Sequence, residues 1–360
     1  MSLVPTTGEL GPVVVIGAGL IGASIGMALT AAGERVHLVD ASNVHAVVAS
    51  GLGAGLIDFP QTETIRLVVV ATPPSAVVQE VLEALELSPQ AVVTDVSSVK
   101  GRVLDKLRAT GADISRYVGS HPMAGSQFAG PLTASGELFV DRTWVVCPRL
   151  DNAPEHVERV RQLARTCGAR LVEMEAADHD EAVARVSHVP QLMSSLTAGN
   201  LRDVPDRHLQ LAGQGVRDVT RIAASDPVLW RQIIQANSSA IRLELEGIRR
   251  DLDELFVVLD DPTGLEGFMA RGREGARTLP GKHGSIPVEW EAVVIEIPDT
   301  PGALAHLFAD IGSEGVNVED LSIEHGSTRE VGYLSVQVSP SQAKHLREVM
   351  VEKGWRLRVV

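Results

Sequence analysis

The chain has 360 residues, 44% of them hydrophobic, and a formal net charge of −14. This length exceeds one ordinary core and predicts two or three domains. The negative charge argues against a protein that follows nucleic-acid phosphates or binds an anionic membrane surface, so we expect neither as a partner.

The N-terminal residues Met1 to Pro12 lack the basic and apolar regions of a secretion signal, and no apolar run reaches the roughly 18 residues of a membrane helix. The two cysteines, Cys147 and Cys167, have no metal-ligand spacing around them. We therefore expect a soluble cytoplasmic protein with reduced core thiols and without a metal site.

The first predicted element is a buried strand that leads through a glycine-rich turn into a helix. Val13 to Ile16 is an apolar β-branched run, typical of a central parallel strand. In the turn that follows, the first glycine permits a tight bend, the second lets a pyrophosphate approach, and the third lets the helix pack closely. The sequence predicts a dinucleotide site at this helix N-terminus. Its residues are Gly17, Gly19, Leu20, Ile21 and Gly22.

An acidic residue follows the second predicted strand. Arg35 to Val39 leads to Asp40, which lies 23 residues after Gly17. A carboxylate there can accept both ribose hydroxyls of NAD. No Arg in residues 41–43 could neutralise a 2′-phosphate, so NAD is favoured over NADP. The alternative is an ordinary glycine turn followed by a surface aspartate.

Later apolar strands of the same half end in polar residues. Ligands of open α/β sheets bind outside the carboxyl ends of the strands, so these residues are expected around one crevice. They are Thr72 and Pro73 after the strand at 67–71, Ser98 after the strand at 91–94, and His121 after the strand at 117–119. Ser97 or Ser98 could instead cap the helix that begins near Val99.

Two further strands, Trp144 to Cys147 and Ala169 to Glu173, flank a helix from Ala153 to Thr166. Strand patterns stop after Ala177, and residues 178–258 have helical patterns almost throughout. We therefore place a Rossmann-type NAD-binding domain at residues 1–175 and an all-α domain at residues 176–283.

Two places in the helical region carry groups that could reach a ligand. Pro190 cannot donate to the carbonyl of Val186 and should kink the helix just after His188, although a single histidine there is more often structural. Asp218 and Arg221 share a helical face. They form either a surface ion pair of little energetic value or an oriented fork for a carboxylate.

A helix is predicted from Ser225-Asp226-Pro227 to Val258. Its roughly 33 residues would span about 50 Å, more than one small domain covers. The pattern predicts packing against a second copy in a homodimer. The alternative is a long helix that lies across its own domain.

Gly272 to Pro287 has the composition of a linker. Residues 287–360 then show a β-α-β-β-α-β order, which fits a ferredoxin-like module. The segments Ile297 to Leu304 and Gly315 to Glu319 resemble loops of ACT domains, which commonly bind amino acids. This resemblance implies an effector site near Asp299, Gly302 and Asn317.

Over almost its whole length the chain resembles the prephenate and arogenate dehydrogenase family of tyrosine biosynthesis. The matching segments are Gly17 to Gly22, Ala71 to Pro73, Thr94 to Lys100, His121 to Gly125, His179-Asp180, Ser187 to Pro190, and Asp218 to Ile222. Seven segments in the right order are far more specific than any one of them. Val189 departs from the leucine of many relatives, and nothing catalytic depends on it.

The resemblance implies a role for each matched residue. His121 would be the catalytic base, Ser98 would touch both substrate and His121, and His188 and Arg221, the latter oriented by Asp218, would hold the substrate. Prephenate carries a ring hydroxyl and two carboxylates, so its oxidation needs such a base and such cations. A neutral histidine, with an ordinary pKa of about 6.5, suits proton removal while hydride leaves for NAD. No metal ion is required.

Several alternatives stay open at this point. The residues do not distinguish a prephenate dehydrogenase from an arogenate dehydrogenase or from a cyclohexadienyl dehydrogenase that accepts both substrates. They also do not establish whether tyrosine or another amino acid acts on the C-terminal module. A β-hydroxyacid dehydrogenase also joins a Rossmann half to long helices, but it needs a helical lysine and residues 176–258 contain none. A non-catalytic sensor of NAD and an amino acid would leave His121, His188 and Arg221 unexplained.

Overall fold

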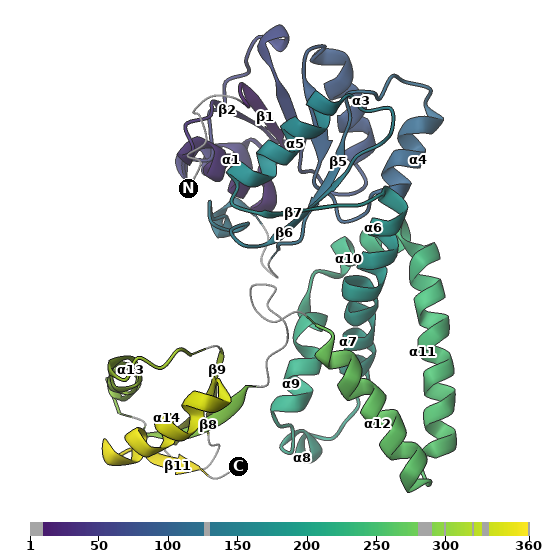
Figure 1. Cartoon of the computed structure of the whole chain (residues 1–360). Coiled ribbons are helices and arrows are strands. Elements are labelled where there is room, and N and C mark those ends of the chain that lie inside the picture. Colours follow the sequence, from purple (N-terminus) through teal and green to yellow (C-terminus); the bar gives the residue numbers. More distant parts are fainter. Residues whose placement is uncertain are drawn as a thin grey trace. The chain divides into compact units, whose positions relative to one another are not determined.

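The computed structural model describes residues 10–125, 130–279, 290–298, 300–318, 320–325 and 331–358. Figure 1 shows the helices and strands of the chain. The chain divides into two compact units, Met1–Asp253 and Glu254–Val360. The predicted boundary near residue 175 lies inside the first of these units, between a strand and a helix.

The first unit begins with a four-stranded parallel sheet in the order β2-β1-β3-β4. The strands are β1 (Val13–Ile16), β2 (Val36–Val39), β3 (Leu67–Val70) and β4 (Val92–Asp95). Their near-continuous apolar sequences predict burial on both faces, and the structure confirms it.

Helices cover the two faces of this sheet. Val13 and Val15 of β1 pack on one face with α1 (Leu20–Ala31) and α5 (Pro154–Thr166). Val14 points to the other face, where α3 (Val77–Leu87) and α4 (Gly101–Ala109) cover it. Full burial of one such side chain stabilises the fold by about 1.5–3 kcal/mol. The predicted Rossmann-like architecture is therefore confirmed. Short helices α2 (Asn43–Gly51), η1 (Thr62–Thr64) and η2 (Pro131–Thr133) complete it.

A separate three-stranded sheet continues this part of the chain. Its strands are β5 (Gly119–Pro122), β6 (Thr143–Cys147) and β7 (Arg170–Glu173), with β5 antiparallel and β7 parallel to β6. A single bridge from Val93 to Tyr117 links it to β4. The expected strand at 117–119 is thus displaced, and His121 lies within β5 rather than after a strand.

The prediction that residues 178–258 are almost entirely helical is confirmed. It contains α6 (Ala176–Val183), a π-helical turn (Ala184–His188), α7 (Val189–Asn200), α8 (Asp206–Leu209), α9 (Gln214–Thr220), η4 (Arg221–Ala224), α10 (Pro227–Ala236), α11 (Ser238–Val258) and α12 (Pro262–Arg277). In the π turn the N–H of Val189 donates to the carbonyl of Ala184, five residues back. The chain passes Pro190 by widening the helix there, as a residue without an N–H requires.

The single long helix predicted for residues 226–258 is wrong. It breaks at Asn237, whose backbone has φ −116° and ψ 27°. The side-chain amide of Asn237 donates to the carbonyl of Asp180 at 2.7 Å and lies 3.1 Å from Nδ1 of His188. These contacts with residues distant in the sequence account for the break. Part of the predicted linker is also helical, because α12 extends to Arg277.

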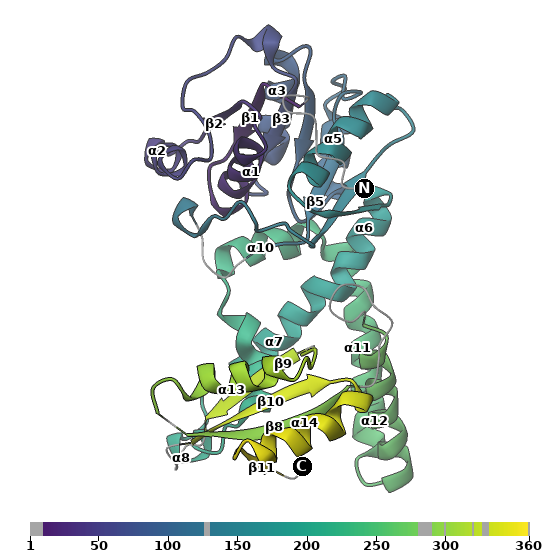
Figure 2. The same ribbon diagram turned by 60° about the vertical axis from the view of Figure 1, so that its left-hand side comes forward.

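The second unit contains a four-stranded antiparallel sheet in the order β11-β8-β10-β9. The elements follow the predicted β-α-β-β-α-β order, and both helices pack on one face of the sheet (Figure 2). They are β8 (Glu291–Pro298), α13 (Ala303–Ser313), β9 (Asp320–His325), β10 (Val331–Val338), α14 (Pro340–Glu352) and β11 (Arg356–Arg358). Identity with an ACT domain stays a prediction.

Cys147 and Cys167 are free and buried, as predicted. Burial raises the pKa of the Cys147 thiol to about 12 and raises that of Cys167 as well. Both are therefore protonated thiols at neutral pH. In the described part of the chain no helix is both long and apolar enough to cross a membrane.

Candidate active site

The glycine-rich turn has the geometry that a pyrophosphate needs. Gly17 has φ +97°, and a Cβ there would lie 2.5 Å from the carbonyl oxygen of Ala71. A Cβ at Gly22 would lie 1.8 Å from the carbonyl oxygen of Gly17, whereas one at Gly19 would meet nothing within 4 Å. The open space therefore lies over Gly19. No side chain caps α1, so the N–H groups of its first turn, which includes Leu20 and Ile21, can bind an anion.

Asp40 lies directly after β2 and is held by the backbone. Its Oδ2 accepts the N–H of Ala18 at 2.7 Å, and its Oδ1 accepts the N–H of Ser42 at 2.7 Å. Each oxygen keeps a lone pair for a further donor. The carboxylate is thus fixed beside the turn, where ribose hydroxyls could donate to it. These features fit a bound dinucleotide.

The other residues predicted around the crevice follow neighbouring strands. Thr72 and Pro73 come after β3, and Ser98 lies half-buried between β4 and α4. The hydroxyl of Thr72 is buried and has no hydrogen-bond partner among the described residues. Neither Ser97 nor Ser98 caps α4. Instead Ser97 donates to the carboxylate of Asp95 and to the carbonyl of Val99.

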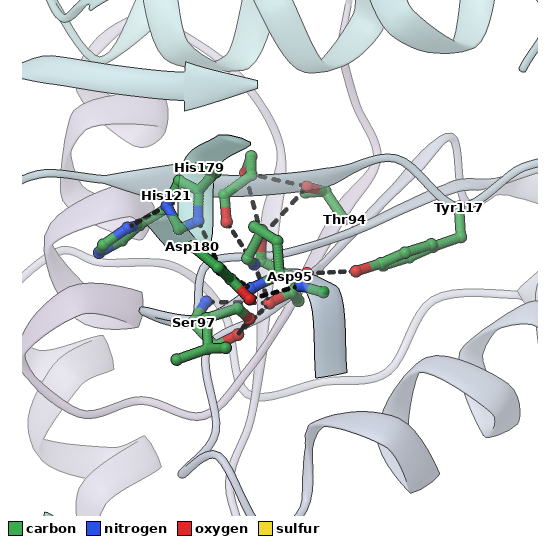
Figure 3. Close-up of polar contacts among 11 residues, drawn as sticks. Thr94, Asp95, Ser97, Tyr117, His121, His179 and Asp180 are labelled. Atoms are coloured by element: carbon green, nitrogen blue, oxygen red, sulfur yellow. Dashed lines mark hydrogen bonds and ion pairs between the residues drawn. The ribbon is translucent and has the colours of Figure 1, made fainter. Parts of the chain in front are cut away.

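The side chain of His121 belongs to a chain of three groups (Figure 3). Its Nδ1 lies 2.9 Å from Nε2 of His179, and Nδ1 of His179 lies 2.8 Å from Oδ1 of Asp180. The Asp180 carboxylate also accepts the N–H groups of Lys100 and Gly101, each at 2.8 Å. Helix α6 is thereby bonded to the N-terminus of α4, and His121 is aligned by a group on α6.

A buried ion pair fixes the backbone next to His121. Lys100 and Asp95 are 1% and 0% exposed and form a short ion pair. Lys100 also donates to the carbonyl of Ser120 at 2.7 Å, and Tyr117 donates to Asp95 at 2.6 Å (Figure 3). Breaking such a pair would leave an uncompensated buried charge, at a cost of roughly 3–5 kcal/mol.

Burial lowers the pKa of His121 well below its ordinary value, and electrostatic interactions with His179, Lys100 and His188 lower it further. His121 is therefore a neutral imidazole at neutral pH. It keeps partial exposure, so a ligand can reach it.

His188 is 1% exposed at the end of the π turn. Its ring packs against that of Trp230 with 6.1 Å between centroids. Burial lowers the pKa of His188 to about 4, although Asp180 raises it in part. The neutral ring accepts the Asn237 amide hydrogen at Nδ1, which leaves its proton on Nε2. His188 can thus donate a hydrogen bond to a ligand.

Asp218 and Arg221 do not form an ion pair with each other in the described part of the chain. Instead, Asp218 accepts a hydrogen bond from the side-chain amide of Gln214 at 2.8 Å. Helix α9 ends at Thr220, and Arg221 begins η4. Arg221 is exposed there, and the neighbouring carbonyl of Ile222 accepts Gln191 of α7 at 2.9 Å.

Sequence reasoning missed the groups that hold His121. In the sequence, His179 and Asp180 stand out only as one of the seven segments that match the family, and Lys100 only as the end of another such segment. The available signal was the adjacent pair His179-Asp180 on a helix, a histidine next to a carboxylate.

Comparisons with known proteins show the family of this chain. Family models match residues 25–173 as "Prephenate dehydrogenase, nucleotide-binding domain" and residues 175–268 as "Prephenate dehydrogenase, dimerization domain". The chain is 32% identical to "Probable prephenate dehydrogenase NovF" of Streptomyces niveus, over 95% of this chain and 98% of that protein. The chain belongs to the prephenate dehydrogenase family.

Two solved structures share the fold. The Synechocystis arogenate dehydrogenase is 26% identical, with a TM-score of 0.64 over 74% of this chain and 98% of that one. The Aquifex aeolicus prephenate dehydrogenase, in complex with hydroxyphenyl propionate and NAD+, is 24% identical, with a TM-score of 0.66 over 73% of this chain and 96% of that one. Both matches leave about a quarter of this chain uncovered.

Proposed function

We propose that this family member catalyses the NAD-dependent oxidative decarboxylation of prephenate to 4-hydroxyphenylpyruvate. The observation that carries the proposal is His121, a neutral, partly accessible imidazole on β5 that lies 2.9 Å from His179 of α6. Its position suits removal of a proton from a hydroxyl whose carbon loses hydride. The family membership names the substrate class.

The oxidation and decarboxylation of prephenate require from the protein a general base and groups that position the substrate and NAD. Nε2 of His121 takes the proton of the ring hydroxyl as hydride leaves the same carbon. The dienone so formed loses the ring carboxylate as CO2, because the product is aromatic. The resulting phenolate takes a proton back, so none is consumed overall.

NAD, when bound, supplies the hydride acceptor. The turn of Gly17, Gly19 and Gly22, with Leu20 and Ile21, would hold its pyrophosphate, while Thr72 and Pro73 would line the crevice beyond β3. Asp40 would accept the ribose hydroxyls and repel a 2′-phosphate. The glycine geometry and the fixed carboxylate support this assignment.

Asp40→Asn should weaken NAD binding and narrow the preference for NAD over NADP. The substitution removes the charge that repels a 2′-phosphate while keeping the side chain's size. Dissociation constants for both cofactors, measured by titration of wild type and variant, check this. An unchanged ratio of the two constants would remove Asp40 from the ribose site.

Substrate-holding roles for Ser98, His188, Arg221 and Asp218 stay proposals. The Nε2–H of His188 can donate to a ligand oxygen, and exposed Arg221 is free to approach a carboxylate. Asp218 would have to exchange its Gln214 contact to orient Arg221.

Arg221→Ala should raise KM for prephenate with little change in kcat. A carboxylate contact is made in both the ground state and the transition state, so its loss appears mainly in binding. Steady-state kinetics test this, with exposed Arg207→Ala of the same region as the matched control. A constant KM combined with a lowered melting temperature would show that Arg221 is architectural.

Arogenate is the alternative substrate, because the arogenate dehydrogenase of Synechocystis shares this fold. The two substrates differ only in a keto or an amino group on the side chain. Initial rates with each substrate and with NAD or NADP decide between them. We expect the highest kcat/KM with prephenate and NAD, and a higher value with arogenate would overturn the substrate assignment.

We further propose a homodimer. The second family model is described as a dimerization domain, and α10 and α11 carry exposed Leu229, Leu243 and Leu252. Apolar side chains of this size on one region favour a protein partner.

The C-terminal module is proposed to be an ACT domain that binds tyrosine. Gly302 directly precedes α13, with φ +87°, and its side chain cannot cap the helix. Asn317 is exposed in the loop before β9, whereas Asp299 lies outside the described residues. The core of this module lies between Val293 and Met350.

A protein that ends near residue 283 should therefore fold, dimerise and keep its kcat. Rates with and without tyrosine should show inhibition only in the full chain, and equal inhibition of both would place tyrosine in the active site.

A further inference from the structure

The proton on His179 can be placed from its hydrogen-bond partners. Asp180 is a carboxylate that accepts two backbone N–H groups at the N-terminus of α4, where the helix dipole also favours a negative charge. An ionised carboxylate can only accept, so Nδ1 of His179 must carry its proton toward Oδ1 of Asp180.

The proton on His121 then follows. A neutral His179 with its proton on Nδ1 has a lone pair on Nε2, which can only accept. The contact of 2.9 Å with Nδ1 of His121 therefore requires the proton of His121 on Nδ1. Nε2 of His121 is left with the lone pair, and it has no hydrogen-bond partner in the part of the chain that the structure describes.

We propose that His179 and Asp180 are positioning residues that keep His121 in this tautomer, with Nε2 as the atom that takes the substrate's proton. This proposal rests on the proposed function, because it assigns how His121 is held for that reaction. In the other tautomer Nε2 would carry a hydrogen and could not act as a base.

A purely structural role for the pair makes different predictions. His179 is 0% exposed, so a role in packing alone would tolerate an apolar residue at least as well as a polar one. A positioning role requires an acceptor toward His121. His179→Gln keeps one, because its amide can donate to Asp180 and accept from His121. His179→Leu removes it.

The test compares kcat for wild type, His179→Gln, His179→Leu and Asp180→Asn at saturating substrate and NAD. We expect His179→Leu to lose about 10²-fold or more and His179→Gln to stay within about tenfold of wild type. Asp180→Asn should lower kcat about as much as His179→Leu does. The NH2 group of the asparagine would face the N–H of Lys100 or of Gly101, each of which needs an acceptor. His37→Leu removes another fully buried imidazole, bonded to Asp58, and serves as the matched control with unchanged kcat.

A double-mutant cycle separates this proposal from the proposed function. If His179 acts through His121, His179→Leu should cause no further loss of kcat in a His121→Asn background. Fully additive losses, or equal kcat for His179→Gln and His179→Leu, would overturn the positioning role while leaving His121 as the base. A His121→Asn variant with wild-type kcat would instead overturn the proposed role of His121 itself.

Discussion

Replacing His121 by Asn should lower kcat by about 10²- to 10⁴-fold, the usual contribution of a positioned general base. Asn keeps polarity and approximate size but cannot take a proton at neutral pH. The pKa of His121 lies well below its ordinary value, so the wild-type base is already neutral and available at pH 7.

The control for this variant is the cofactor. NAD affinity should be unchanged, because the glycine turn and Asp40 follow β1 and β2, whereas His121 lies on β5. Steady-state kinetics and an NAD titration on the same preparation give both values. A kcat within about threefold of wild type would exclude His121 as the base.

The second large effect is a loss of stability as the pH falls from about 6.5 to 4. The pKa of His188 is about 4 in the folded protein and near its ordinary value of about 6.5 in the unfolded chain. In this window the unfolded chain binds more protons, so the free energy of unfolding decreases as the pH decreases. His188 alone accounts for about 3 kcal/mol, and His121 acts in the same direction.

Urea unfolding midpoints between pH 7 and pH 4.5 measure this dependence. His188→Gln should show a flatter dependence than wild type, because it removes the group that must stay neutral in the fold. Carboxylates titrate in both proteins and cancel in the comparison. Parallel curves for the two proteins would contradict the assigned pKa of His188.

Local signals in the sequence predict most of the structure of the nucleotide-binding half. An apolar run, a glycine turn with fixed spacing and a following acid each report on backbone conformation or on one ligand contact. The structure shows φ +97° at Gly17 and a fixed carboxylate at Asp40, as those patterns require.

The errors arose where distant residues decide the local conformation. The helix breaks at Asn237 because its amide reaches Asp180 and His188, and no periodicity within residues 226–258 records those contacts. Strand β5 pairs with β6 instead of extending the parallel sheet, which moves His121 into the strand itself.

The same reason explains why the candidate site was found only in part. His121 and His188 could be named from motifs, but the hydrogen bonds that orient His121 join α4, β5 and α6. In the sequence, Asp95 has the pattern of the polar end of a strand, and Lys100 has that of the start of a helix. Their burial as an ion pair beneath Ser120 depends on packing that no local pattern encodes.

The central claim is that this chain couples hydride transfer to NAD with decarboxylation of prephenate. The most direct measurement incubates purified full-length protein with prephenate and NAD and quantifies NADH and 4-hydroxyphenylpyruvate in the same samples. The account predicts that both products form in equal amounts with wild type and at a rate lower by about 10²-fold or more with His121→Asn. NADH without 4-hydroxyphenylpyruvate, or neither product, would contradict it.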